Sequence, residues 1–342
     1  VFADAEGNIA YFHSNFVPRR TTAFDWDRPV DGSNPETEWQ GVHTLEETVG
    51  SLNPPNGWIQ NTNNWPYSVA GDHSPKREDF PSYMDTGLEN PRGIHAIRVL
   101  ENKTDFTVDS LIEAAYDSYL TAFEPLIPAL LAAYDQTPSS DPLKAALADQ
   151  VEVLRGWDYR WAESSVATSL AVLWGEELMA RVKIAAPAAG DLVYDYMVSR
   201  TTGAEKLQAL AAASDRLVQD FGSWRTPWGE INRFQRISAE IAHPFDDDQP
   251  SRAVGFTSGR WGSLASFGAR RYEGSKKLYG TGGNSFVAVV EFGDRVSAKA
   301  VTAGGLSGDP NSPHFDDQID RYCTGDLRDV YFYPDQLEGH TE

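Results

Sequence analysis

"FTVDSLIEAAYDSYLTAFEPLIPALLAAYD", residues 106–135, is the stretch that decides the fold class of this 342-residue chain. Its apolar residues recur at the three- and four-residue spacing of an amphipathic helix. Pro125 and Pro128 are expected to end or kink that helix, because proline lacks a backbone N–H and its ring clashes with the preceding turn. The stretch therefore predicts helices in the middle of a chain whose two ends follow another pattern.

Helical spacing extends to both sides of this stretch. Before it, residues 90–103 show a helical pattern with Pro91 at a helix-start position. After it, further amphipathic patterns occupy residues 141–157, 163–182 and 203–222. The middle of the chain, from about residue 91 to about residue 222, is therefore predicted to be a helical block.

Strand patterns stand at both ends of the chain. "VFADA" and "IAYFHSNF" flank the turn "EGN" within residues 1–16, which predicts a β-hairpin, and "WIQNTN" at 58–63 also reads as a strand. Residues 284–293 and 295–305 meet near Gly293-Asp294, a second hairpin signal. Strands, then helices, then strands predict an α+β body with a helical insertion. The expected parts are a strand-rich region 1–90 with an Asn-rich loop, a mainly helical region 91–250, and C-terminal strands 251–342 that return to the sheet.

The composition favours a globular enzyme or a binding protein. The formal net charge is −21 and there are ten tryptophans. A strongly acidic chain repels phosphate backbones and anionic lipids, so neither nucleic acid nor a membrane is expected as a partner. Cys323 is the single cysteine and cannot form an internal disulfide, and the histidines show no zinc-site spacing. Acidic loops such as 244–250 read as solvated loops rather than calcium sites.

The most unusual local feature is "GWIQNTNNWPYS", residues 57–68, which gathers Asn61, Asn63 and Asn64. Asparagine is common in tight turns because its side chain bonds nearby backbone and tolerates left-handed conformations. The alternative is a carboxamide that donates hydrogen bonds to a group that becomes negative during a reaction. Arg92 follows, and its forked, permanently charged guanidinium suits the fixing of a nearby dipole. From spacing alone, a turn and a surface cation are favoured over a catalytic pair.

Resemblance to a known family changes this balance. Five stretches resemble the penicillin acylase family of N-terminal nucleophile hydrolases, in the order of that family and over nearly the whole chain. The matching stretches are "VFADAEGNIAYFHSNFVPRR" (1–20), "NPPNGWIQNTNNWP" (53–66), "NPRGIHAIRVL" (90–100), "LRGWDYRWAESSVATSLAVLW" (154–174) and "YGTGGNSFVAVVEFGDRVSAKAVTAGGLSGDPNSPHFDDQIDRY" (279–322). The last stretch is most similar to family members that act on acyl-homoserine lactones and lipopeptides.

The resemblance implies an αββα sandwich and a precursor that cuts itself into a small and a large chain. The large chain of such enzymes begins with a serine, whose hydroxyl attacks an amide carbonyl while its own α-amine acts as the base; such an amine titrates near about 8. The stretches present here match only the C-terminal part of the large chain, which starts at Val1. We therefore expect an incomplete αββα sandwich that lacks the serine and is inactive alone.

The expected partners are the small chain and the N-terminal part of the large chain from the same precursor, in the periplasm or outside the cell. The expected reaction is removal of an acyl chain from an amine-bearing nucleus such as a β-lactam, an acyl-homoserine lactone or a lipopeptide. No cofactor is expected. The resemblance allows a structural calcium ion in the intact enzyme, for which Asp85 is the local candidate.

The resemblance also assigns roles to residues. It places the oxyanion-binding carboxamide on Asn63, with Asn61 as the second choice, while Asn64 faces the other way if the strand at 58–63 continues. It places Arg92 near the nucleophile's amine, where a positive charge lowers the pKa of that amine. The aromatic residues expected to flank the acyl pocket are Trp58, Trp65 and Tyr67.

A second hypothesis comes from a different class of protein. The abundance of aromatic residues also suits a non-catalytic module that binds carbohydrates or peptides through an aromatic surface. This hypothesis requires tryptophans that are exposed, whereas tryptophans buried in a core would argue against it.

Overall fold

The computed structural model describes residues 1–13, 16–189 and 192–340, which form two compact units. Unit 1 comprises Val1–Ala114, Val289–Ala298 and Val330–Glu342, and unit 2 comprises Ala115–Ala288 and Lys299–Asp329. Helices and strands are both present, as the α+β prediction requires. The units do not follow the predicted boundaries at 90 and 250, because the first predicted helix clusters with the N-terminal strands.

Unit 1 contains a small antiparallel sheet of order β1-β2-β3. Strand β1 (Phe2–Ala3) pairs with β2 (Ile9–Phe12), which confirms the N-terminal hairpin, and β2 pairs with β3 (Gly50–Leu52). The rest of the unit is mostly loop with short helical turns and two α-helices. These elements are η1 (Pro35–Thr37), η2 (Leu45–Glu47), η3 (Pro66–Ser68), η4 (Gly71–His73), η5 (Arg77–Asp79), η7 (Pro334–Leu337), α1 (Pro91–Leu100) and α2 (Val108–Ala115).

The strand predicted at 58–63 is wrong. This segment forms no regular strand, and its base is closed by the Gln60 N–H donating to Val69 O at 2.8 Å. The physical reason is that its Asn and Thr side chains bond nearby backbone groups and so compete with a β-ladder. Strand alternation therefore cannot decide which way Asn61, Asn63 and Asn64 point.

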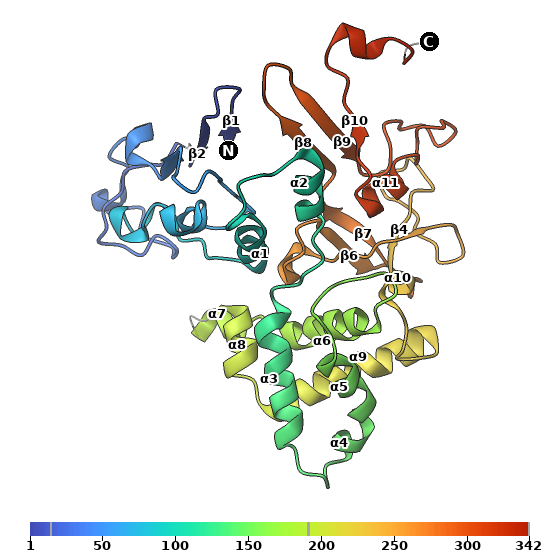
Figure 1. The fold of residues 1–342 in the computed structure, drawn as a ribbon. Helices are drawn as coiled ribbons and strands as arrows, with labels where there is room; N and C mark the ends of the chain where they lie inside the picture. Colours follow the sequence, from blue (N-terminus) through green and yellow to red (C-terminus); the bar gives the residue numbers. More distant parts are fainter. Residues whose placement is uncertain (14–15, 190–191, 341–342) are drawn as a thin grey trace. The chain divides into compact units, whose positions relative to one another are not determined.

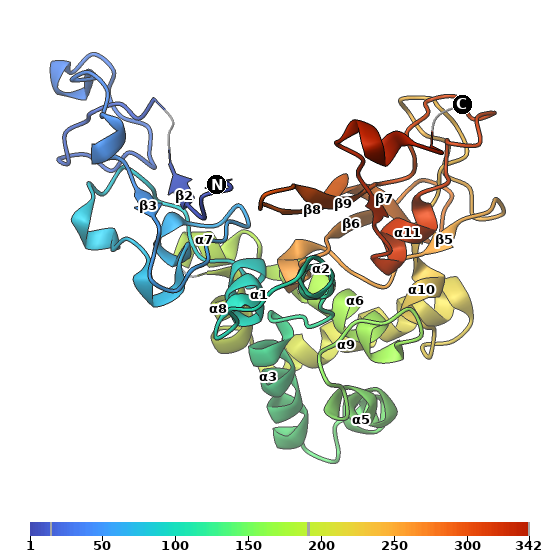
Figure 2. The same cartoon turned by 45° about the horizontal axis from the view of Figure 1, so that its top comes forward.

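Unit 2 is built around helices, which lie together in both views of the chain (Figures 1 and 2). They are α3 (Phe123–Gln136), α4 (Pro142–Ala146), α5 (Ala148–Arg155), α6 (Val166–Val182), α7 (Ala185–Ala189), α8 (Val193–Ser199), α9 (Gly203–Phe221), α10 (Trp228–Ile231) and α11 (Ile319–Thr324), with a 3-10 turn η6 (Gly259–Trp261). The predicted helical block is therefore confirmed in its content.

The prolines of the first-quoted stretch affect its helix less than expected. The break between α2 and α3 covers residues 116–122, before either proline. Pro125 lies in the first turn of α3, where a missing N–H costs nothing because no intrahelical acceptor awaits it. Pro128 lies inside α3, yet the helix continues to Gln136. Burial of Phe123, Leu126, Ile127 and Leu130 holds this helix in place.

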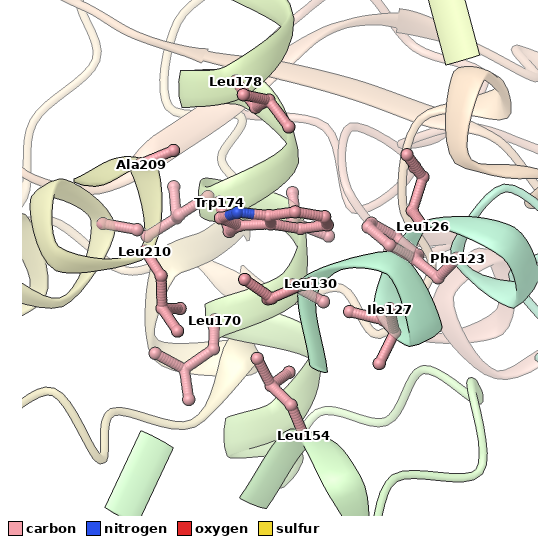
Figure 3. Close-up of a cluster of buried hydrophobic side chains, with 14 of the residues drawn as sticks. Phe123, Leu126, Ile127, Leu130, Leu154, Leu170, Trp174, Leu178, Ala209 and Leu210 are labelled. Atoms are coloured by element: carbon pink, nitrogen blue, oxygen red, sulfur yellow. The ribbon is translucent and has the colours of Figure 1, made fainter. Parts of the chain in front are cut away.

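Helix α6 is the centre of the unit 2 core (Figure 3). Every residue from 167 to 175 in it is buried, so the helix is apolar all round, as expected for a helix surrounded by others. It contacts α9, α5 and α8. Trp174 is fully buried between side chains of α3 and α9, among them Leu130 and Leu210. Gly175 is required on α6, because a Cβ there would lie 2.6 Å from the Trp261 ring.

A four-stranded sheet of order β5-β4-β7-β6 belongs to the same unit. Strand β7 (Leu278–Gly283) lies between β6 (Phe267–Arg271), to which it is antiparallel, and β4 (Asn232–Phe234), to which it is parallel. Strand β5 (Arg252–Ala253) pairs with β4. A third sheet of order β10-β9-β8 confirms the second predicted hairpin, and its strands are β8 (Phe286–Glu291), β9 (Ser297–Thr302) and β10 (Arg328–Asp329).

Helix α9 is closed at both ends by its own sequence, and its N-terminal cap offers a test. The Glu205 N–H donates to Thr202 Oγ1 at 3.2 Å, and the Thr202 N–H donates to a Glu205 carboxylate oxygen at 2.7 Å. Thr202→Ala is expected to lower the free energy of unfolding by about 1 kcal/mol, measured by urea denaturation followed by circular dichroism. Ser139→Ala, which removes an exposed hydroxyl outside any cap, is the control, and an equal loss there would contradict the capping role.

Within the described residues, no helix is both long enough and apolar enough to cross a lipid bilayer.

Candidate functional site

The Asn-rich loop of unit 1 is a closed turn that holds Asn63 in a left-handed backbone conformation, with φ of 59°. The Asn63 N–H donates to Asn61 Oδ1 at 3.3 Å, and the Thr62 N–H donates to Asn64 Oδ1 at 3.0 Å. Gln60 closes the loop from below, since its Nε2 donates to Ser68 O at 3.0 Å. Asparagine tolerates the left-handed region better than most residues, which explains its presence at position 63.

Helix α1 aims Arg92 at this loop. Asn90 caps the helix by accepting a hydrogen bond from the Gly93 N–H at 2.8 Å, and Pro91 occupies the first helical position. The next residue, Arg92, donates through Nη2 to Thr62 O and to Asn63 Oδ1, both at 2.5 Å. The loop and the helix start, 29 residues apart in sequence, are thus joined at one guanidinium.

The contact between Arg92 and Asn63 fixes which way the carboxamide points. A guanidinium can only donate hydrogen bonds, so the Asn63 atom that it meets is the oxygen and not the nitrogen. The Nδ2 group is then turned away from Arg92, and among the described residues it has no acceptor. Asn63 is exposed. The arrangement leaves two N–H donors available to an atom that arrives from outside the loop.

The charge of Arg92 is not neutralised locally. Partial burial lowers the pKa of its guanidinium, but the ordinary value lies so far above neutrality that the group stays positive. No carboxylate among the described residues lies within ion-pair distance of it, and its bonding partners are neutral oxygens. The site therefore combines a neutral donor with an uncompensated positive charge.

A carboxylate that the sequence reasoning missed fastens the loop to the helix start. Glu89 Oε1 accepts hydrogen bonds from Asn64 Nδ2 and from the Asn90 N–H, both at 2.8 Å. Its Oε2 accepts from Trp65 Nε1 at 3.3 Å and from the Ser68 hydroxyl. Asn64 is thus a structural residue of the loop. A glutamate directly before an Asn-Pro helix start was the only local signal.

Glu89→Gln tests this fastening. An amide would place hydrogens against one set of donors, leaving them unsatisfied, at a cost of about 1–3 kcal/mol. We expect faster native-state hydrogen exchange at the Asn90 and Gly93 amides, because local opening becomes easier. Glu113→Gln, at an exposed position on α2, is the matched control. Unchanged exchange at both amides in the Glu89 variant would show that the carboxylate does not hold the loop.

The aromatic residues named from the sequence do not form one group. Trp65 and Tyr67 meet edge to face, with ring centroids 5.7 Å apart, and Trp65 lines a cavity of about 360 Å³ with residues including Trp26 and Tyr83. Tyr67 lies against Phe80, and burial raises the pKa of its hydroxyl. Trp58 packs on Gly71, where an added Cβ would lie 3.2 Å from its ring. An acyl pocket flanked by Trp58, Trp65 and Tyr67 remains a prediction.

No group of three metal-ligating side chains occurs among the residues that the structure describes. Asp85, the candidate for calcium, accepts from the Gly87 N–H at 2.8 Å and lies 3.7 Å from His13 Nε2. Cys323 is buried, and burial raises the pKa of its thiol to about 12, so the reactive thiolate is disfavoured. The chemistry of this unit therefore rests on Asn63 and Arg92.

Comparison with known families places the whole arrangement in context. The sequence model of the penicillin amidase family matches residues 1–339. The chain belongs to the penicillin amidase family. The resemblance read from the five ordered stretches is thereby confirmed.

Two relatives show how much of a penicillin amidase this chain represents. Penicillin G acylase of Escherichia coli is 29% identical over 167 residues, which make up 46% of this chain and 17% of that protein. The solved thermostable penicillin G acylase of Alcaligenes faecalis covers 99% of this chain with a TM-score of 0.58 at 18% identity, and the match takes in 65% of that chain. The chain thus has the fold of part of a penicillin acylase and spans less than two thirds of the length of either relative.

Proposed function

We propose that this chain provides the oxyanion-binding part of an amide hydrolase that removes an acyl chain from an amine-bearing nucleus. The observation that carries the proposal is the bond from Arg92 Nη2 to Asn63 Oδ1, which turns the Asn63 N–H donors outward. A donor held in this way costs no reorganisation when negative charge develops on a carbonyl oxygen. Membership of the penicillin amidase family supports amide hydrolysis as the reaction.

The proposed nucleophile is the hydroxyl of an N-terminal serine that lies outside residues 1–342. Its oxygen bonds to the amide carbon, and its own α-amine takes the hydroxyl proton. The tetrahedral oxyanion accepts a hydrogen bond from Asn63 Nδ2. The amine passes the proton to the leaving nitrogen, the C–N bond breaks, and water then hydrolyses the ester that remains. The greater length of the relatives supports a source for this serine in the same precursor.

Arg92 has a second proposed role, which pH dependence can test. A positive charge near the α-amine disfavours its protonation and lowers its pKa, which keeps the base free near neutral pH. Arg92→Gln removes the charge and is expected to raise that pKa, so the acidic limb of kcat/KM should move to higher pH. Arg92→Lys keeps the charge and should leave the limb in place, although it loses the fork that holds Thr62 and Asn63. An unmoved limb in the Gln variant would contradict the electrostatic role.

The finer features remain part of the proposal. We place the chain in an αββα sandwich completed by a small chain and by the N-terminal part of the large chain. Periplasmic or extracellular location, substrates among β-lactams, acyl-homoserine lactones and lipopeptides, and a calcium ion in the intact enzyme follow from the same resemblance. Trp58, Trp65 and Tyr67 are the proposed wall of the acyl pocket.

Complementation tests the function directly. The chain would be produced alone and together with the segment encoded upstream of Val1, and release of primary amine would be followed with phenylacetyl amides, acyl-homoserine lactones and a lipopeptide. We expect release only from the combined protein. Release by the isolated chain would show that the nucleophile lies within it, and a processed but silent combined protein would overturn the assignment.

The rival reading as an aromatic binding module receives no support from the placement of the tryptophans. Trp174 and Trp261 are fully buried in the core of unit 2, and Trp228 is 2% exposed. Among the described tryptophans only Trp39 is strongly exposed, at 62%. A single exposed ring does not make the aromatic surface that this function requires.

A further inference from the structure

Unit 2 contains a cavity that the proposed hydrolysis does not use. Its volume is about 470 Å³, and it is lined by residues of α6, α10, β6 and β7, with Arg216 from α9. The apolar part of its wall includes Leu173, Phe267 and Leu278. The size suits a small organic molecule, since ligand sites commonly fall between about 300 and 1,000 Å³.

The charge of this cavity is opposite to that of the protein. Four arginines line it, together with one glutamate, in a chain whose formal net charge is −21. Arg260 is paired with Glu176 at 3.2 Å, and Arg271 binds both oxygens of Asp220, at 3.0 and 3.1 Å. These two guanidinium groups are therefore neutralised within the unit.

The other two arginines retain charge. Arg216 comes only within 3.7 Å of an Asp220 oxygen that already serves Arg271. Arg270 has no carboxylate partner among the described residues, and its guanidinium lies over the Tyr272 ring at 4.6 Å. The cavity wall thus carries positive charge that no side chain described in the structure balances.

Buried polar atoms without partners concentrate at the same place. In the described part of unit 2, six buried side-chain atoms lack a hydrogen-bond partner, and three of them belong to residues that line this cavity. They are Nε1 of Trp228, Nε1 of Trp261 and Oδ1 of Asn232, on side chains that are 2%, 0% and 1% exposed. Buried polar atoms are normally satisfied, so a cluster of orphans indicates a missing partner.

We propose that this cavity binds a small carboxylate with a flat apolar body. Its carboxylate would accept hydrogen bonds from the two indole N–H groups and balance the charge of Arg216 and Arg270. Its body would lie against Phe267 and the other apolar wall residues. Asn232 Oδ1 can accept one donor from such a ligand, while its Nδ2 already donates to Val254 O and Phe256 O. The site is independent of Asn63 and of amide hydrolysis.

Benzoate and benzamide are the matched probes, because they share shape and differ in charge. We expect benzoate, and not benzamide, to shift the ¹⁵N indole signals of Trp228 and Trp261 in the full chain, with the Trp228→Phe variant identifying one signal. Isothermal titration should give a benzoate affinity that falls at least tenfold in an Arg216→Gln/Arg270→Gln variant. Weakening with added salt should accompany this loss.

Two further variants keep the test decisive. Arg216→Lys/Arg270→Lys retains both charges and should recover most of the affinity, which separates charge from packing. Arg155→Gln, on α5 and paired with Asp135 outside the cavity, should bind benzoate as the unchanged chain does. Equal binding of benzamide, unmoved indole signals, or undiminished affinity in the double Gln variant would each overturn the proposal.

Discussion

Asn63→Ala in the complete enzyme is expected to lower kcat by about 10²- to 10³-fold, as found when one oxyanion donor is removed from comparable sites. That loss corresponds to roughly 3–4 kcal/mol of transition-state stabilisation. KM should change little, because the carboxamide meets full negative charge only in the transition state. Steady-state kinetics of the processed enzyme, with amine release as the signal, measures both constants.

The left-handed backbone at position 63 complicates a simple alanine variant, and two controls resolve this. Asn63→Gly removes the carboxamide while relieving the strain of φ at 59°, so it should lose as much kcat as Asn63→Ala. Asn102→Ala places alanine at another left-handed asparagine, with φ of 61°, and should cost stability without lowering kcat. A glycine variant with kcat within threefold of the unchanged enzyme would show that the backbone, and not the donor, matters.

The helices of unit 2 were predictable because their apolar spacing is long and regular. Helix α6 and helix α9 lie where the patterns at 163–182 and 203–222 place them. Helix α8 was missed because its seven residues are too few to show a period. The pattern at 141–157 contains two helices, α4 and α5, which a single amphipathic pattern does not separate.

The site was predictable only in part, for a different reason. The turn around Asn63 and the start of α1 are each visible in the sequence, and the family resemblance suggested that they act together. The bond between them depends on the path of the chain from the loop to the helix, which no local pattern specifies. Glu89 shows this most clearly, since its partners Asn64, Trp65 and Ser68 stand 21 to 25 residues before it.

Trp174→Ala is expected to have the largest effect on stability, a loss of about 3–5 kcal/mol in the free energy of unfolding. The ring is fully buried at the middle of α6, and its Nε1 donates to Lys206 O on α9 at 3.0 Å. Removing it leaves a cavity between α3, α6 and α9 that close-packed neighbours cannot fill without moving these helices. The variant also loses a hydrogen bond that ties α6 to α9.

Urea denaturation followed by far-ultraviolet circular dichroism measures the loss of Trp174 without relying on the fluorescence that the substitution itself changes. The helical signal comes mainly from unit 2, so it reports the unit that contains the ring. Trp39→Ala, at a tryptophan that is 62% exposed in unit 1, is the matched control and should stay within about 0.5 kcal/mol of the unchanged chain. Equal denaturation midpoints for the two variants would mean that α6 is not the centre on which the packing of unit 2 depends.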